Sequence, residues 1–511
     1  MVTEAKADRA YELRWWTLAV LCLSLVIVFV GNSSLNVTLP TLSRVLDAST
    51  SQLQWVVAIY SLVFAGLLFT TGAIGDRFGR KGALQLGLIV FLVAALAATR
   101  ADAMWELIGC RALMGLAAAF IMPSTLSILI NVFPPEERSK AIAIWASFLG
   151  AAGAVGPVIS GWLLGHFWFG SVFFVNVPFI AAALAAGWFL VPTSRDPKQA
   201  SLDPVGAMLS IVGLCSLVYA LIEAPTDGWL SPVTLGASGF AIVVLTLFAF
   251  WELHLDEPML DIRYFKIPAF STGTGGMILV FMGMYGIFFL LTQYFQLVLG
   301  LSALGAALRT LPFSPIMLTV SPMTPRLSAR FGAHRVVAAG MLAAGVGFAL
   351  FTGIGIHSPY AYVLCCFLPF SVGVSLTMSP MTASIMSAVP ARRAGAGSAM
   401  NDASRELGAA LGIAILGSIA ASRYASRLRH VIVNLAPAAR HQARSSIASA
   451  LAVAHNLGGA SGAAVGHGAR LAFLDGIHLA CMVGALLAFA SAGIVLRYLP
   501  HQVNTEVLVE D

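Results

Sequence analysis

The sequence predicts an all-α protein that crosses a membrane many times. Hydrophobic residues make up 59% of its 511 residues and charged residues only 10%, against roughly 45–50% and about 25% in a soluble domain. The mean hydropathy is +0.87. The apolar residues form repeated runs of about 20, the length that crosses a hydrocarbon core ~30 Å thick. These observations exclude a soluble globular class and predict a polytopic helical membrane protein.

Fourteen apolar runs predict 14 transmembrane helices. The first run follows Lys6, Arg9 and Arg14 and is too long for the core of a signal peptide, so we expect it to remain as a helix. In chain order the runs cover residues 15–38, 53–73, 83–100, 104–132, 141–164, 171–192, 205–223, 232–252, 268–291, 304–323, 335–356, 359–382, 396–421 and 474–497.

Lysine and arginine gather in the loops of one side. Alternate loops contain segments such as Arg77–Lys81 and Arg138–Lys140, whereas the short loops of the other side contain only Arg44 and Arg100. Because short cytoplasmic loops are enriched in positive charge, both termini, residues 1–14 and 498–511, are predicted to be cytoplasmic. The net charge of +6 is thus assigned to membrane topology, since no basic stripe suited to nucleic acid is present.

The chain has an internal duplication. The residues Arg77-Phe78-Gly79 follow the second helix, and Arg330-Phe331-Gly332 follow the tenth. This repeat predicts two six-helix bundles, over residues 15–192 and 268–497, with an inserted helical hairpin at 205–252. The connection 422–473 is expected to be a long outer loop that is partly an amphipathic helix. Paired bundles suit alternating access around a site at the middle of the membrane.

A ten-residue segment at the end of the second helix reads GAIGDRFGRK. Its glycines allow close helix approach and a tight turn, its aspartate offers a carboxylate to an arginine or a helix N-terminus, and its cations suit lipid headgroups. The positive-inside rule alone explains the cations but not the spacing of the glycines and the aspartate. The candidates for a conformational role are Gly72, Asp76, Arg77, Gly79, Arg80 and Lys81.

This segment resembles the signature loop of the major facilitator superfamily. The segments LQWVVAIYS (Leu53–Ser61) and WFGSVFFVNVP (Trp168–Pro178), with the count of fourteen helices, are similar to its fourteen-helix drug/proton antiporter branch, and the resemblance covers about residues 15–500. It implies the major facilitator fold, transport by alternating access and no enzymatic activity.

The fifth helix contains GAAGAVGPVISGW, in which Gly153, Pro157 and Gly161 recur every four residues. This spacing, with Gly156 in the same run, predicts a smooth face for a neighbouring helix and a bend at the proline. Ordinary packing of small residues is the alternative. The segment also resembles the motif that the family's exporters carry, which implies export.

Arg111 is a charge inside the apolar fourth helix, where it needs a partner, water or the interface. Either it tunes the N-terminal half or it snorkels to the outer surface, about one turn away. The first helix departs from the family pattern, since Gly31 stands where an aspartate is usual. In relatives that acid is assigned to proton coupling or cation recognition. Its loss leaves the coupling position open and favours neutral or anionic substrates.

Glu406 is the leading candidate for proton coupling. At ~1.5 Å per residue it lies roughly 15 Å into the thirteenth helix, near the middle of the membrane, with Asp402 four residues earlier on the same face. A carboxylate removed from water is suited to exchanging protons near neutral pH. The alternative is a structural ion pair with Arg405. Glu223 and Asp475 are expected at the membrane interface.

Aromatic, methionine and polar residues on the helices that line the central cavity of the resembled fold predict a substrate wall. Packing against the core or lipid is the alternative for each. The candidates are Asn32, Asn36, Tyr60, Met122, Tyr285, Phe288, Phe289, Gln293 and Met378.

We therefore expect a multi-pass protein of the cytoplasmic (inner) membrane that exports small amphipathic compounds, driven by inward proton flow. Its partners would be substrate, protons and membrane lipid. The sequence has no metal-ligand spacing, phosphate-binding glycine loop or nucleotide motif, so no cofactor, metal, ATP or nucleic acid is expected. A dedicated exporter of one native metabolite or lipid is the alternative. An intramembrane enzyme is a remote one, because the serines of the first helix lack a partner acid or histidine.

Overall fold

The computed structural model describes residues 11–194, 202–255, 258, 260–390 and 394–500 of the chain. Within this part, 13 helical segments are long and apolar enough to cross a membrane, when Ser171–Leu190 and Ala303–Phe331 are each counted as one segment. The expected fifth span lies in one further long helix, α6 (Pro135–His166), which is continuous over 32 residues. The predicted all-helical membrane fold is confirmed. Residues 1–10 and 501–511, most of the two predicted cytoplasmic tails, lie outside the described part.

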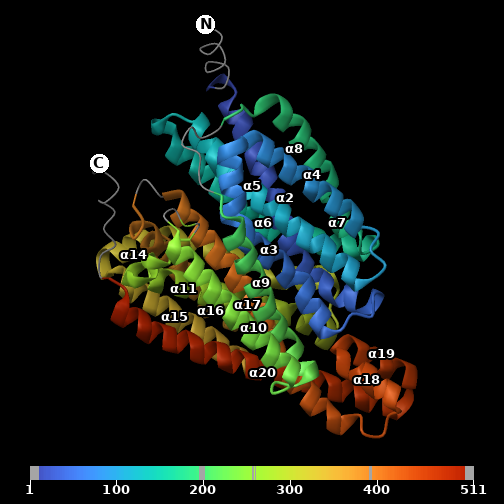
Figure 1. Ribbon diagram of the computed structural model, residues 1–511. Helices are drawn as coiled ribbons and strands as arrows, with labels where there is room; N and C mark the ends of the chain where they lie inside the picture. Colours follow the sequence, from blue (N-terminus) through green and yellow to red (C-terminus); the bar gives the residue numbers. More distant parts are fainter. Residues whose placement is uncertain (1–10, 195–201, 256–257, 259, 391–393, 501–511) are drawn as a thin grey trace.

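The N-terminal half is drawn from blue to teal in Figure 1. α5 packs against α3 and α4, and α2 packs against α6 and α8. The expected sixth span is broken at Val175, between α7 and α8. The helices of this half are α2 (Arg14–Val45), α3 (Thr50–Phe78), α4 (Arg80–Ala98), α5 (Met104–Val132), α6, α7 (Ser171–Phe174) and α8 (Asn176–Leu190).

The C-terminal half, drawn from yellow-green to red, packs α11 against α16 and α17, and α15 against α16 and α20. The expected tenth span, 304–323, is divided into α12, α13 and a short 3-10 turn (Ser321–Met323) that leads into α14, with Pro312 and Pro322 at the breaks. Proline removes a backbone donor and clashes with the preceding turn. The long helices are α11 (Pro268–Gln293), α15 (Ala333–Phe351), α16 (Tyr360–Ser387), α17 (Ala394–Val431) and α20 (Gly459–Tyr498), and the short ones are α12 (Ala303–Thr310), α13 (Phe313–Val320) and α14 (Thr324–Phe331).

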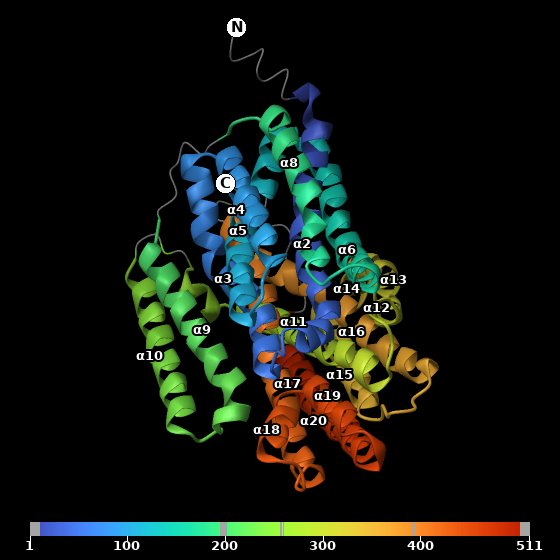
Figure 2. The same cartoon turned by 90° about the vertical axis from the view of Figure 1, so that its right-hand side faces the viewer.

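A helical hairpin, α9 (Pro204–Asp227) and α10 (Pro232–His254), lies beside the two halves, as Figure 2 shows in green. α9 packs against both α3 and α17. Two indole donors tie the hairpin to both halves: Trp55 donates to Glu223 at 3.1 Å, and Trp229 of the hairpin donates to Ser422 at 3.1 Å. The hairpin thus covers the seam between α3 and α17.

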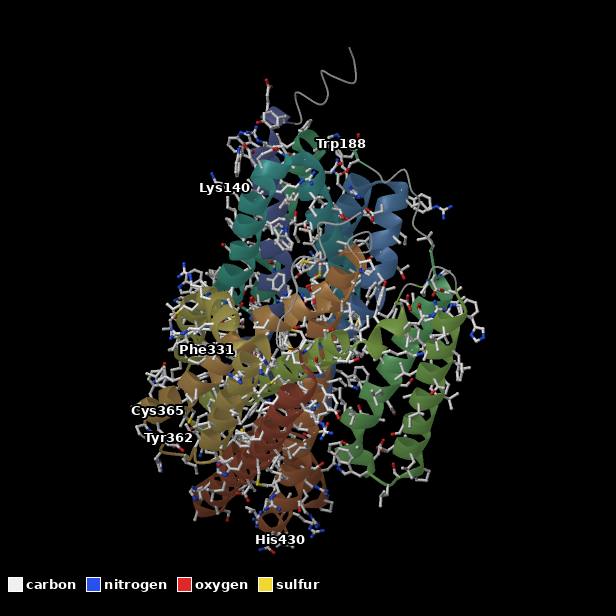
Figure 3. All side chains as sticks on the ribbon, turned by 90° about the vertical axis from the view of Figure 1, so that its left-hand side faces the viewer. Lys140, Trp188, Phe331, Tyr362, Cys365 and His430 are labelled. Carbon is white, nitrogen blue, oxygen red and sulfur yellow. The ribbon has the colours of Figure 1, made fainter. Side chains whose placement is uncertain are left out.

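The connection expected as an outer loop, 422–473, is mostly helical, so its expected boundaries were wrong. α17 continues to Val431, since no proline interrupts the sequence before Pro437, and α20 begins as early as Gly459. We call α18 (Pro437–Ser445) and α19 (Ile447–Leu457) the cap. The end of the molecule that carries the cap is the cap side, and the end that carries Gly72–Lys81 is the motif side. Figure 3 places His430 at the cap side and Trp188 at the opposite end.

The cap contacts the N-terminal half. The hydroxyl oxygens of Ser43 and Ser446 lie 3.2 Å apart, and the Thr50 hydroxyl donates to the Ser445 carbonyl at 3.0 Å. Within its own half, the cap is held to α17 because Tyr424 donates to the Ala443 carbonyl at 2.9 Å. The two halves are therefore joined at the cap side.

Candidate transport site

A cavity of about 450 Å³ lies between the two halves. This volume falls within the ~300–1,000 Å³ range of small-molecule sites. α2 and α6 form one wall, and α11, α13, α16 and α17 form the other. One of its lining residues, Leu318, is 65% exposed. The position of the cavity between the halves makes it the candidate transport site.

Four of the predicted cavity residues, Asn36, Tyr285, Phe288 and Met378, lie on this wall. The other five lie in the packed interior. Asn32 and Tyr60 contact Arg111, and Gln293 donates to the Phe289 carbonyl of its own helix at 3.1 Å. Met122 and Phe289 are buried among other apolar side chains.

The sequence interpretation missed several wall residues, among them Phe281, Met284, Met317 and Arg405. On α11 a signal was available. Phe281, Tyr285, Phe288 and Thr292 are spaced by four, three and four residues and so share one helix face. The same steps of four, three and four residues recur on the wall at Thr310, Ser314, Met317 and Ser321, across α12, α13 and the turn that follows, so the sequence carried a signal there as well.

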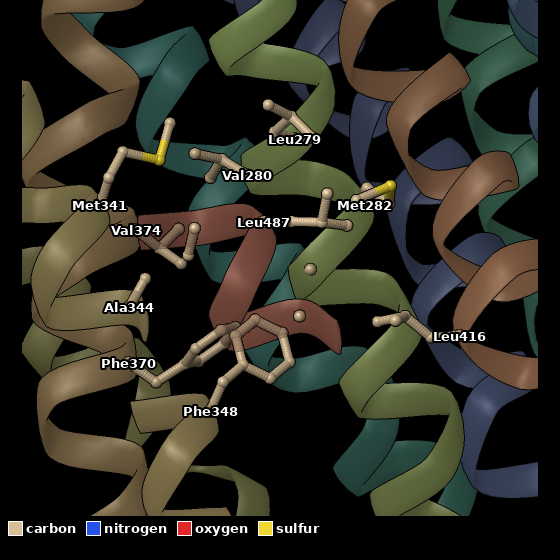
Figure 4. A pocket seen from close by; sticks show the side chains of 13 residues that line it. Leu279, Val280, Met282, Met341, Ala344, Phe348, Phe370, Val374, Leu416 and Leu487 are labelled. Atoms are coloured by element: carbon tan, nitrogen blue, oxygen red, sulfur yellow. The ribbon is translucent and has the colours of Figure 1, made fainter. Parts of the chain in front are cut away.

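A second cavity, shown in Figure 4, lies inside the C-terminal half and measures only about 20 Å³. Its wall is apolar and includes Leu279, Phe348 and Leu416. It is far too small for a drug-sized ligand. We treat it as a packing void of that half.

Arg111 is fully buried, with 0% of its surface exposed, so the snorkelling alternative is wrong. Its guanidinium donates to the carbonyls of Val56 and Gly31 at 3.1 and 3.2 Å and to Asn32 Oδ1 at 3.0 Å. The guanidinium carbon lies 4.3 Å from the centre of the Tyr60 ring. Oxygen dipoles and a π face therefore hold this charge and fasten α5 to α2 and α3.

Glu406 lies where α17 meets α3 and is only 8% exposed. The Ser61 hydroxyl donates to its Oε2 at 2.6 Å. Among the described residues, Arg405 forms an ion pair with Asp402, whose Oδ1 lies 3.5 Å from the guanidinium, and not with Glu406. Since Tyr60 contacts Arg111, two consecutive residues of α3 contact the buried cation and the buried carboxyl group.

The signature segment ties three helices of the N-terminal half together. Arg80 Nε donates to Asp76 Oδ1 at 2.7 Å, and Lys81 Nζ donates to the Trp188 carbonyl of α8 at 2.6 Å. Gly79 has a φ of +122°, a conformation that L side chains rarely adopt. Gly72 faces Pro123 of α5, and Arg77 lies over the Phe78 ring.

The small residues of α6 meet three different surroundings. A Cβ at Gly156 would come within 3.3 Å of the Val30 Cα in α2, and one at Gly161 would come within 2.7 Å of the Leu304 Cα in α12. Gly153 and Pro157 line the cavity. α6 therefore contacts the other half at its cap-side end and faces the cavity further along.

The comparison with protein families agrees with this architecture. A family model described as Major Facilitator Superfamily matches residues 21–413. The chain belongs to this superfamily. Among its relatives in the Major Facilitator Superfamily is the multidrug efflux pump LfrA of Mycolicibacterium smegmatis, 36% identical over 482 residues, which are 94% of this chain and 95% of that protein.

Two further relatives are drug-resistance proteins. The multidrug resistance protein Stp of Mycobacterium tuberculosis is 32% identical over 504 residues, covering 96% of this chain and 93% of that protein. The methyl viologen resistance protein SmvA of Salmonella typhimurium is 32% identical over 467 residues, covering 90% of this chain and 93% of that protein.

Among solved structures, a bacterial homologue of the human lysosomal transporter Spinster matches with a TM-score of 0.66 at 18% identity, over 95% of this chain and 98% of that one. This match supports the fold. The predicted superfamily is confirmed, and the chain is a multi-pass membrane transport protein, not an enzyme.

Proposed function

We propose that this protein exports small amphipathic compounds from the cell by alternating access and is driven by proton antiport. The names of its relatives, which are efflux pumps and drug-resistance proteins, support drug efflux. The cavity between the halves supports a binding site that each side of the membrane reaches in turn. Its aromatic and methionine wall suits varied apolar ligands.

The observation that carries proton coupling is the contact between Glu406 and Ser61. It joins α17 of one half to α3 of the other at 2.6 Å, in a buried position. A hydrogen bond to an ionised carboxylate is roughly twice as strong as one between neutral groups. Protonation of Glu406 therefore weakens a bond between the halves, which links proton binding to their relative movement. Asp402, four residues away, pairs with Arg405 and is the second acid of this proposal.

In this proposal the motif side and both termini face the cytoplasm, and the cap faces outward in the cytoplasmic membrane. The state described here then has its outer side closed by the cap and by the contact between Gly161 and Leu304. The segment from Gly72 to Lys81 braces the N-terminal half during the movement, and α6 is the surface that separates from α12.

The test is dye transport in everted membrane vesicles with an imposed pH gradient, which nigericin then collapses. We expect wild-type protein to accumulate the neutral dye N-phenyl-1-naphthylamine until the gradient is removed. Glu406→Gln should lose gradient-driven accumulation at unchanged protein level. Glu223→Gln is the matched control, because it removes another acid of the apolar helices, one that accepts from Trp55 at the hairpin and does not join α17 to α3.

Unchanged pH-driven transport in Glu406→Gln would reject the coupling role of this residue. Protein-dependent transport that survives collapse of the gradient in the wild type would reject proton antiport itself. Failure of the wild type to move any amphipathic probe would reject drug efflux.

A further inference from the structure

Arg405 gives the cavity a positive charge. Among the described residues that line the cavity, it is the only charged one. Around it the wall presents aromatic rings, methionines and small polar groups. Two of these polar atoms, Ser33 Oγ and Asn36 Oδ1, are buried and have no hydrogen-bond partner within the described protein. The wall thus offers a guanidinium and neutral polar groups to a ligand, but no carboxylate.

The nearby acids already have partners inside the protein. Glu406 accepts the Ser61 hydroxyl at 2.6 Å, and Asp402 lies 3.5 Å from Arg405 and 3.4 Å from the Asn401 amide. Neither belongs to the described wall of the cavity. On α2 the residue at position 31 is glycine, and its carbonyl accepts from Arg111. A substrate cation in this cavity would therefore meet no free carboxylate among the described wall residues.

The aromatic surface next to Arg405 is also occupied. The guanidinium carbon lies 4.9 Å from the centre of the Phe281 ring, and Phe281 stacks with Tyr285 at 6.3 Å between ring centres. Organic cations bind to proteins chiefly through aromatic faces and carboxylates. Here the protein's own cation covers one of the faces that a substrate cation would use.

We propose that Arg405 selects the charge of the substrate: the cavity takes aromatic compounds that are uncharged or anionic and carry an acceptor oxygen, and it disfavours organic cations. This inference rests on the proposed transport function of the cavity. A guanidinium has five N–H donors and no acceptor, so it binds a carbonyl, phenolate or carboxylate oxygen of the ligand. The aromatic wall supplies the stacking surface for the ring system.

The size of the preference follows from the charges. A unit charge on the ligand about 6 Å from the guanidinium, in a medium with an effective dielectric constant near 20, changes the affinity for the ligand by about a hundredfold. Asp402 neutralises part of the charge of Arg405. We therefore expect at least about a tenfold difference in dissociation constant between an anionic and a cationic ligand of the same shape.

The experiment compares fluorescein and rhodamine 123, which share a xanthene ring system but differ in the sign of their charge. Binding of each dye to purified full-length protein in lipid nanodiscs is measured by fluorescence anisotropy. We expect the wild type to bind fluorescein at least about tenfold more tightly than rhodamine 123. Arg405→Gln should bring the ratio to within about threefold, whereas Arg405→Lys, which keeps the charge, should retain most of it.

Arg497→Gln is the matched control, because that arginine lies over Tyr498 at the end of α20. It should leave the ratio unchanged. Equal binding of the two dyes by the wild type, tighter binding of rhodamine 123, or an unchanged ratio in Arg405→Gln would each overturn the inference. If Arg405→Gln does not fold, the wild-type ratio and Arg405→Lys decide the question.

Dye binding is independent of transport, so the two proposals fail separately. Failure of wild-type vesicles to move any amphipathic probe rejects the exporter proposal alone. A wrong binding ratio, with movement of the neutral dye intact, rejects the role of Arg405 alone.

Discussion

The close approach of α6 and α12 should hold the cap side closed, and Gly161→Ala tests this. An added Cβ at Gly161 would lie 2.7 Å from the Cα and 2.9 Å from the backbone nitrogen of Leu304. These are backbone atoms, so no change of side-chain rotamer relieves the clash. The two helices must move apart, and they belong to different halves of the protein.

The expected magnitude follows from the cost of over-packing, about 1–3 kcal/mol. Such a cost changes the ratio of cap-closed to cap-open molecules by about 5- to 150-fold. Alanine also favours a helix over glycine by roughly 0.5–1 kcal/mol, whichever state the transporter is in. Gly153→Ala is the matched control on the same helix, because a Cβ there would meet no atom within 4 Å.

The assay is a distance measurement between spin labels on the two halves. Val45, at the end of α2, and Val433, just after α17, are 57% and 61% exposed and lie at the cap side. The exposed Cys365 is first replaced by serine. We expect Gly161→Ala to move the distance distribution in nanodiscs to longer values. The distribution of Gly153→Ala should be the same as that of the wild type. A wild-type distribution in Gly161→Ala, or the same shift in both variants, would show that this contact does not control closure.

Three further substitutions test other contacts. Arg111→Lys should lower the melting temperature, since a single ammonium replaces a planar group and leaves buried carbonyls without donors at about 1–3 kcal/mol each; equal melting of both proteins would contradict this. Trp229→Phe removes the donor to Ser422 and should speed hydrogen exchange at the hairpin tip, with no change expected elsewhere. Gly412→Ala would place a Cβ against the Met282 carbonyl of α11 and should lower the yield of folded protein. Gly493→Ala, whose Cβ would meet no atom within 4 Å, should leave the yield unchanged.

Local patterns were sufficient to predict most of the helices. Runs of apolar residues must be satisfied as helices in a membrane, because lipid offers no partner for backbone groups. The predictions failed where a local rule competed with another one. The tenth span is apolar, but its prolines divide it into short pieces. The connection 422–473 is polar enough to suggest a loop, yet its two ends are continuations of the helices α17 and α20.

The candidate site was predictable only in part. Glu406 and Arg111 stood out because charges in apolar spans are costly. That Arg405 faces the cavity while Glu406, one residue later, faces α3 follows from the rotation of about 100° per residue in a helix once one direction is known. Sequence periodicity cannot supply that direction for a helix that is apolar on nearly every side.

The helical membrane class and the unusual buried charges follow from composition, because the free-energy cost of placing a polar or apolar residue in a membrane does not depend on where its helix packs. The family follows from the motifs. The partners of the buried charges follow from neither. Ser61 and Glu406 are separated by 345 positions in the chain, and Arg111 reaches carbonyls on two other helices. Only the packing of the helices brings such groups together. The same packing places the hairpin over the seam between α3 and α17, places the cap over one end of the molecule and gives the cavity its charge.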